Sequence, residues 1–278
     1  MSGPASLKTL APIAGYLTLL ELSVGTAVAA YVIDAAGRVG RGYVGSTAGI
    51  CTAVAGVALL IGIYVPTDIT LLSAPISGGA MSSLIHWNIG YVGALLVLAL
   101  FCWVGTDLAR RVIGAGVLAV GGVCIGKAAV AIGPAISGAG GAVAVLVPAT
   151  LVTGVALAGM LLGHWYLVAP SLSFRPLRQM VRLVLGALGV ESAVIAAVLL
   201  ASSPGARAQL IGGYALPFWL LVIGAGIVFT ALVTLLTGHF ARIRANQPAT
   251  AMLYVLIISV LMGVVPAHLL FFVTGTPV

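Results

Sequence analysis

The chain alternates between long apolar runs and short polar breaks over its whole length. The runs are typically 20 or more residues long, and a helix of about 20 apolar residues crosses a hydrocarbon layer about 30 Å thick. Transmembrane β-strands would give short segments of alternating polarity instead, and the sequence contains no such pattern. We predict eight membrane helices, over residues 9–34, 43–65, 80–105, 109–133, 139–168, 177–202, 211–240 and 249–274.

The breaks between the runs carry charge, proline or glycine, which are typical of helix ends. Examples are "TDLARR", "SFRPLR" and "RIRANQP". The breaks are too short to fold as domains of their own. We therefore expect an all-α integral membrane protein, with one polytopic helical domain over residues 1–278. The first apolar run is longer than a signal-peptide core, so we expect it to remain as a helix.

Composition agrees with a membrane protein. Hydrophobic residues make up 62% of the chain and charged residues 6%, whereas soluble domains carry about a quarter charged residues. The net charge of +7 could indicate nucleic-acid binding, but the basic residues lie in short breaks between apolar runs. In that position they indicate topology. We expect a lipid bilayer as the surrounding medium and no nucleic-acid partner.

The basic residues predict how the chain is oriented. The breaks after the first, third, fifth and seventh predicted helices hold nine arginines, whereas the opposite side holds only Lys8 and Arg207. Basic residues favour the cytoplasmic side. We expect both termini on the outer side of a bacterial-type cytoplasmic (inner) membrane. The nine are Arg38, Arg41, Arg110, Arg111, Arg175, Arg178, Arg182, Arg242 and Arg244.

Four histidines lie on four different predicted helices. His86 and His268 fall near the predicted outer face, and His164 and His239 near the inner face. A b-type haem iron takes axial imidazoles from two sides, so ligands from two helices at matching depth suit it. The pattern predicts two bis-histidine haems b, with His86 and His268 on one iron and His164 and His239 on the other.

Two stacked haems would carry electrons across the bilayer. On this hypothesis the protein is a cytochrome b-like electron-transfer subunit of an oxidoreductase complex. It would connect a quinone pool to other redox subunits or a soluble cytochrome. Histidine and tryptophan also favour membrane interfaces because they are amphipathic, so "HW" at 86–87 and 164–165 could be interfacial anchors instead.

Three charged residues fall within the hydrocarbon part of the predicted helices, which costs about 2.5–3.5 kcal/mol for each unpaired charge. Glu21 and Glu191 lie near mid-depth and Lys127 nearer the outside. A Lys–Glu pair would reduce the cost. These residues and Asn88 are candidates for a proton or quinone site. They also leave open a proton-coupled transporter of a small solute or ion.

Other chemistry is largely absent from the sequence. Nucleotide-binding, zinc-protease and nucleophile-elbow motifs do not occur, which excludes a self-contained hydrolase of these types. Cys51, Cys102 and Cys124 lie inside apolar runs and suggest neither disulfides nor a cysteine metal site. A cofactor-free membrane anchor for a redox complex remains a third alternative.

Overall fold

Helices account for nearly all of the computed structural model, which describes residues 7–36, 39–65, 76–169 and 172–278. Within these residues, eight helices are long and apolar enough to cross a membrane, as the sequence predicts. Their bounds are α1 Leu7–Ala35, α2 Arg41–Ile63, α3 Gly78–Val104, α4 Asp107–Ile132, α5 Gly138–Val168, α6 Arg175–Ala201, the Pro217–Arg242 span and α9 Asn246–Thr274.

Local sequence explains several helix ends. The Ser77 and Thr106 hydroxyls accept hydrogen bonds from the backbone N–H groups of Ala80 and Ala109, at 3.3 and 3.2 Å, and so cap α3 and α4. Such caps satisfy N–H groups that have no partner within the helix. At the other end of the chain, Gly275 closes α9 with a positive φ of 72°, a conformation that glycine adopts readily.

The seventh predicted helix is less regular than the sequence suggests. It begins with α7 (Pro204–Ala208), continues through π-helical turns at Gln209–Gly213 and Pro217–Phe229, and ends as α8 (Thr230–Arg242). The Thr230 hydroxyl donates to the carbonyl of Ala225 at 3.0 Å. Such π-helical segments are rare and frequently lie at functional sites.

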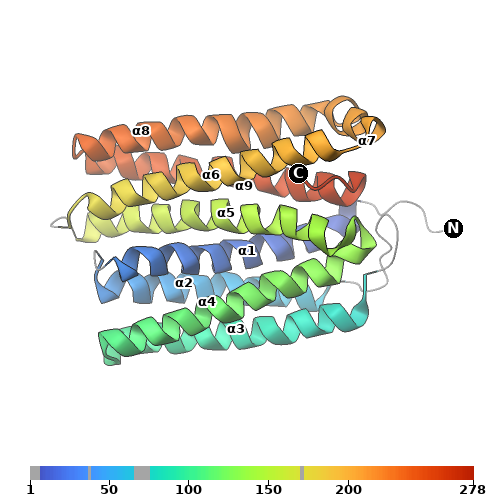
Figure 1. The fold of residues 1–278 in the computed structure, drawn as a ribbon. Coiled ribbons are helices and arrows are strands. Elements are labelled where there is room, and N and C mark those ends of the chain that lie inside the picture. The colour runs from blue at the N-terminus through green and yellow to red at the C-terminus, as the bar shows by residue number, and fades with distance from the viewer. Residues whose placement is uncertain (1–6, 37–38, 66–75, 170–171) are drawn as a thin grey trace.

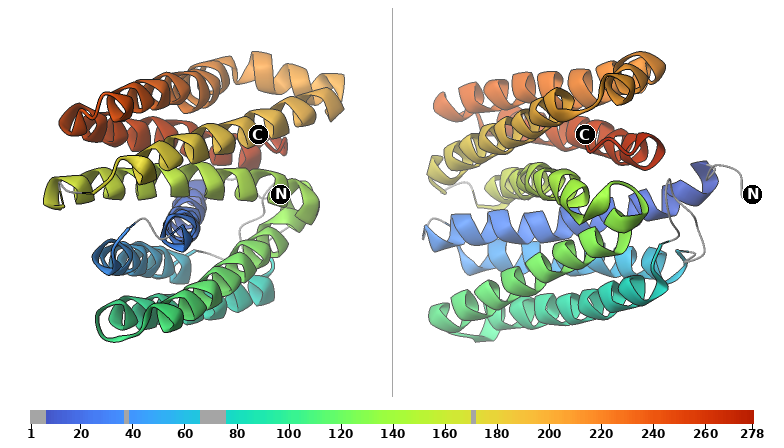
Figure 2. Two further views of the ribbon diagram at one scale, coloured as in Figure 1. Left: turned by 60° about the vertical axis from the view of Figure 1, so that its left-hand side comes forward. Right: turned by 45° about the vertical axis from the view of Figure 1, so that its right-hand side comes forward.

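The helices form two halves with the same internal arrangement. In the first half, α1 packs on α2 and α4, and α3 completes the ring. In the second half, α5 packs on α6 and α9, and α8 completes the ring. The helices α1 and α5 lie between the outer helices of the two halves (Figures 1 and 2). Both are more buried than the other membrane-spanning helices.

The contacts between the halves are also repeated. The first helix of each half packs on the first helix of the other, and also on its second and last helices. Because each half has four spans, this arrangement matches a parallel repeat about an axis along the membrane normal. A short matching stretch supports it: "LSVGTAVA" at 22–29 corresponds to "LVTGVALA" at 151–158.

Two glycines make the central crossing possible. A Cβ atom on Gly25 of α1 would lie 2.8 Å from the Cα atom of Gly154 on α5, and would also clash with the carbonyl of Thr150. These two glycines hold equivalent places in the matching stretches. Small residues let membrane helices approach closely and gain van der Waals contact. The same device recurs where Gly226 meets Gly263 of α9.

The arginines of the predicted cytoplasmic side gather at one end of the bundle, which we call the basic end. Among the described residues, Arg41, Arg110 and Arg111 begin α2 and α4, Arg175 begins α6, and Arg242 ends α8. Arg38 lies outside the described residues. The first turn of α1 and the last turn of α9 lie at the opposite end (Figure 1).

We predict that Gly25→Ala destabilises the bundle by about 2 kcal/mol, because an added methyl group overpacks the crossing of α1 and α5. Thermal unfolding in detergent measures this effect. Gly49→Ala is the matched control, since a Cβ atom there meets nothing within 4 Å. Equal melting temperatures for the two variants would contradict the close crossing.

Candidate functional site

The most unusual polar group in the bundle is a glutamate at the centre of its central helix. Glu21 lies at the midpoint of α1, about 21 Å from either end of the helix. Its side chain is fully buried. A carboxylate at this depth is costly unless it is paired or protonated, and such residues usually have a function.

His268 of α9 is the partner of Glu21. Its Nε2 atom lies 3.2 Å from Oε1 of Glu21, and its Nδ1 atom lies 3.1 Å from the hydroxyl oxygen of Thr18. Thr18 and Glu21 are one helical turn apart, so a single face of α1 holds both nitrogens of the imidazole. The contact joins the two halves of the molecule, because α1 belongs to the first and α9 to the second.

Glu191 of α6 completes this group. It lines a small cavity together with His268, Pro148 and Ala144. The cavity volume is about 10 Å³, which is roughly the room that one water molecule needs. Pro148 has no N–H to donate to the carbonyl of Ala144, so a backbone acceptor is freed at the cavity wall. We call Thr18, Glu21, Glu191 and His268 the Glu21 cluster.

The opposite face of α1 carries a second set of buried polar groups. The Ser23 hydroxyl lies 2.9 Å from the carbonyl of Cys51 and 3.4 Å from the Tyr91 hydroxyl. Toward the first turn of α1, Tyr16 neighbours Asn88. The Tyr16 hydroxyl and both polar atoms of the Asn88 side chain lack hydrogen bonds. Unsatisfied buried polar atoms are uncommon and call for an explanation.

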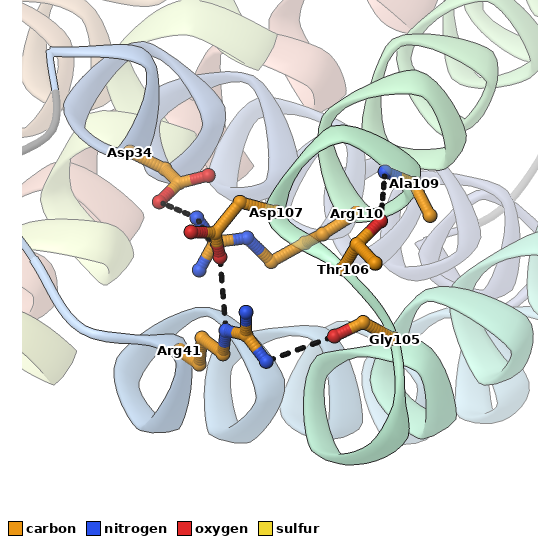
Figure 3. A network of polar contacts seen from close by, with 7 residues as sticks. All are labelled: Asp34, Arg41, Gly105, Thr106, Asp107, Ala109 and Arg110. Carbon is orange, nitrogen blue, oxygen red and sulfur yellow. Dashed lines mark hydrogen bonds and ion pairs between the residues drawn. The ribbon is translucent and has the colours of Figure 1, made fainter.

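At the basic end this face of α1 ends in an ion pair. Nη2 of Arg110 lies 3.0 Å from Oδ1 of Asp34, and both side chains are buried. Oδ1 of Asp107 lies 3.7 Å from Nη2 of Arg110 and 2.9 Å from Nε of Arg41. Negative and positive side chains therefore alternate from Asp34 to Arg41 (Figure 3). Arg41 also donates to the carbonyl of Gly105. Arg41 and Arg110 were predicted to mark topology, and their pairing with Asp34 and Asp107 was not predicted.

These groups extend through the first half of the bundle. From Tyr16 to Asp34, α1 advances about 27 Å, with Ser23 between them on the same face. A narrow cavity reaches from Asp34 and Arg110 to Thr47 and Cys51. We call this set the polar line. Its members from α1 to α4 are Tyr16, Ser23, Asp34, Thr47, Cys51, Asn88, Tyr91 and Arg110.

The Lys–Glu pair that the sequence leaves open does not form among the described residues. Lys127 is partly exposed on α4, and no described carboxylate forms an ion pair with it. Glu21 is paired with His268 instead. Among sequence-predicted residues, the structure therefore brings together Glu21, Glu191 and His268, and it leaves Lys127 apart from them.

The histidines predicted to share the outer haem do not meet. His86 is exposed on α3, where its Nδ1 atom lies 2.7 Å from the carbonyl of Ser82. His268 lies in the other half of the molecule, and α1 and α2 separate α3 from α9 (Figure 1). Both ring nitrogens of His268 already have polar neighbours. The structure therefore places His86 and His268 in different halves of the molecule.

The inner pair is also separated. His164 is exposed on α5, and its Nδ1 atom lies 3.3 Å from the Tyr254 hydroxyl of α9. His239 is exposed on α8 and lines a groove between α8 and α6. Both α6 and α9 pack on α5 and on α8. The structure therefore places His164 and His239 on two helices that α6 and α9 both contact. No group of three or more His, Cys, Asp or Glu among the described residues could hold a metal ion.

Searches for relatives gave no match to this chain among family models, curated proteins or solved structures. The chemistry of the site therefore has to be argued from its geometry. The Glu21 cluster combines two carboxyl groups, an imidazole and a hydroxyl in the membrane interior. Such groups can bind, hold and pass protons.

We predict that Arg110→Met lowers the free energy of unfolding by about 3 kcal/mol, because it leaves the Asp34 carboxylate buried without its partner. The double variant Asp34→Leu with Arg110→Met should recover most of that loss, since no stranded charge remains. Denaturation in detergent provides the free energies.

Arg41→Met is the matched control. The Arg41–Asp107 pair is largely exposed, at 47% and 64% of the side chains, and exposed pairs contribute about 1 kcal/mol or less. Additive effects of the Asp34 and Arg110 substitutions would show that the two side chains do not interact.

Proposed function

We propose that this protein couples proton binding to the transport of a small ion across a membrane. The observation that carries the proposal is the Glu21–His268 contact, which lies in the bundle centre and joins the two halves. Many carriers hold their substrate and coupling ions near the bilayer midplane, at the interface between structural repeats.

The geometry supports a proton step at this contact. Nε2 of His268 and Oε1 of Glu21 are 3.2 Å apart, which is within reach for proton exchange. Protonation of Glu21 removes its negative charge and so changes one of the links between the halves. Glu191 lines the adjoining cavity and supplies a second carboxyl group from α6.

Features near the cluster favour relative movement of the halves. Gly25 and Gly154 have no side chains, so no side chains interlock α1 and α5 at these two positions. Pro148 interrupts the hydrogen-bond ladder of α5, and Pro266 that of α9 only two residues before His268. Rocking of one repeat against another is a common way to expose a central site to each side in turn.

The size of the interior spaces limits the substrate. The cavities beside the Glu21 cluster and along the polar line measure about 10 and 20 Å³. These volumes suit a proton, a water molecule or a single small ion better than an organic solute. We infer that the carried species is a small inorganic ion.

Orientation and location belong to the same proposal. The arginine-rich breaks support a cytoplasmic basic end, with both termini outside, in a bacterial-type cytoplasmic membrane. Electron transfer through two haems b stays a prediction, together with its quinone and redox-subunit partners. So does the cofactor-free anchor. The histidine positions described above do not favour haem binding.

We predict that everted vesicles containing the protein lose an imposed acid-inside pH gradient when one ion of a panel is added. The panel is Na⁺, K⁺, Li⁺ and Cl⁻, and a pH-sensitive dye reports the gradient. Glu21→Gln should abolish the response, because the amide cannot take up the transported proton. His86→Asn should retain it, since His86 is an exposed histidine far from the cluster.

Two outcomes would contradict the proposal. One is an ion response that persists in Glu21→Gln. The other is a b-type haem spectrum of the purified protein that is lost in His164→Ala, which would restore the electron-transfer interpretation.

A further inference from the structure

A basic groove lies between α6 and α8 at the basic end of the bundle. It has a volume of about 740 Å³, far more than the interior cavities. Four arginines and one histidine line it. We call it the arginine groove, and its basic residues are Arg175, Arg178, Arg182, His239 and Arg242.

Helical spacing concentrates these charges in one place. Arg175, Arg178 and Arg182 are three and four residues apart, so they lie on one face of α6. His239 and Arg242 lie on the facing side of α8 by the same rule. Between them Gly238 lets the helices approach, because a Cβ atom there would lie 3.2 Å from Cγ1 of Val181.

The positive charge of the groove has no counter-charge in the described protein. The chain has five acidic residues, and Asp68 lies outside the described residues. Of the other four, Asp34 pairs with Arg110, and Asp107 contacts both Arg41 and Arg110. The remaining two, Glu21 and Glu191, belong to the Glu21 cluster. The four groove arginines have exposed side chains and form no ion pair with a described carboxylate.

The arginine groove is basic at the helix ends and apolar in its deeper part. Arg175 is the first residue of α6 and Arg242 the last of α8, so the charges lie at the helix ends, at headgroup level. Leu185 and Leu235 line the deeper part. Leu185 is about 15 Å from Arg175 along the helix axis, a distance that reaches past the headgroups into the hydrocarbon.

We infer that the arginine groove binds an anionic phospholipid, with its phosphate among the arginines and an acyl chain along Val181, Leu185 and Leu235. Arginine forms paired hydrogen bonds with phosphate oxygens. Basic pockets between membrane helices on the cytoplasmic side bind anionic headgroups. The apolar floor distinguishes this ligand from a free anion, which has no use for it. The inference does not depend on proton-coupled transport.

Native mass spectrometry of the detergent-purified protein tests the inference, with phosphatidylglycerol and phosphatidylcholine as probes. We expect phosphatidylglycerol to remain bound and phosphatidylcholine to dissociate. The double variant Arg178→Gln with Arg182→Gln should weaken phosphatidylglycerol binding by about thirtyfold, since each arginine near an anionic lipid contributes about 1 kcal/mol. Circular dichroism verifies that the variants remain helical.

Arg111→Gln is the matched control. Arg111 is exposed at the same end of the bundle but lies outside the groove, so this variant should bind phosphatidylglycerol like the unmodified protein. The inference is wrong if the double variant binds the lipid equally well, or if Arg111→Gln weakens binding to the same extent. It is also wrong if inorganic phosphate displaces the lipid at equal concentration, which would indicate a free-anion site.

Discussion

The contact between Glu21 and His268 places two ionisable side chains at the centre of a mostly apolar bundle. Both side chains are buried, and they come from the central helix of one half and the last helix of the other. Removing either partner would leave the other without compensation in a medium that solvates charge poorly. The packing around the contact must therefore hold α1 and α9 at a defined distance. Close glycine contacts between α1 and α5, and between the π-helical segment and α9, permit this packing.

Helix α1 connects the two polar systems of the molecule. One face directs Thr18 and Glu21 toward α9, and the other directs Tyr16, Ser23 and Asp34 toward α2, α3 and α4. A helix with polar groups on two faces would be unstable alone in lipid, since unsatisfied polar groups are costly there. It is stable here because other helices surround it (Figure 2).

Sequence patterns predicted the membrane-spanning helices to within a few residues, because length and hydropathy alone determine whether a helix can cross a bilayer. They did not reveal the two-half arrangement. The matching stretches around Gly25 and Gly154 are only eight residues long, and small apolar residues are common throughout the chain. The π-helical turns before α8 were missed because hydropathy does not distinguish between types of helix.

The candidate site was predicted only in part. Glu21, Glu191 and His268 were recognised as unusual, but spacing along a chain does not tell which helices are neighbours. A Lys–Glu pair with Lys127 was therefore considered, without a choice between Glu21 and Glu191. Arg110 was interpreted only as a topology residue, because charge near a helix end is ordinary. The four histidines were paired by depth alone, because the lateral positions of their helices come only from the packing of α3, α5, α8 and α9.

The central claim is that Glu21 takes up and releases a proton inside the bundle. Infrared difference spectroscopy between acid and alkaline states of the reconstituted protein measures this directly. We expect a carbonyl band of a protonated carboxyl group that disappears in Glu21→Gln and persists in Asp34→Asn. A band that is unchanged in Glu21→Gln, or no such band in the unmodified protein, would contradict the account.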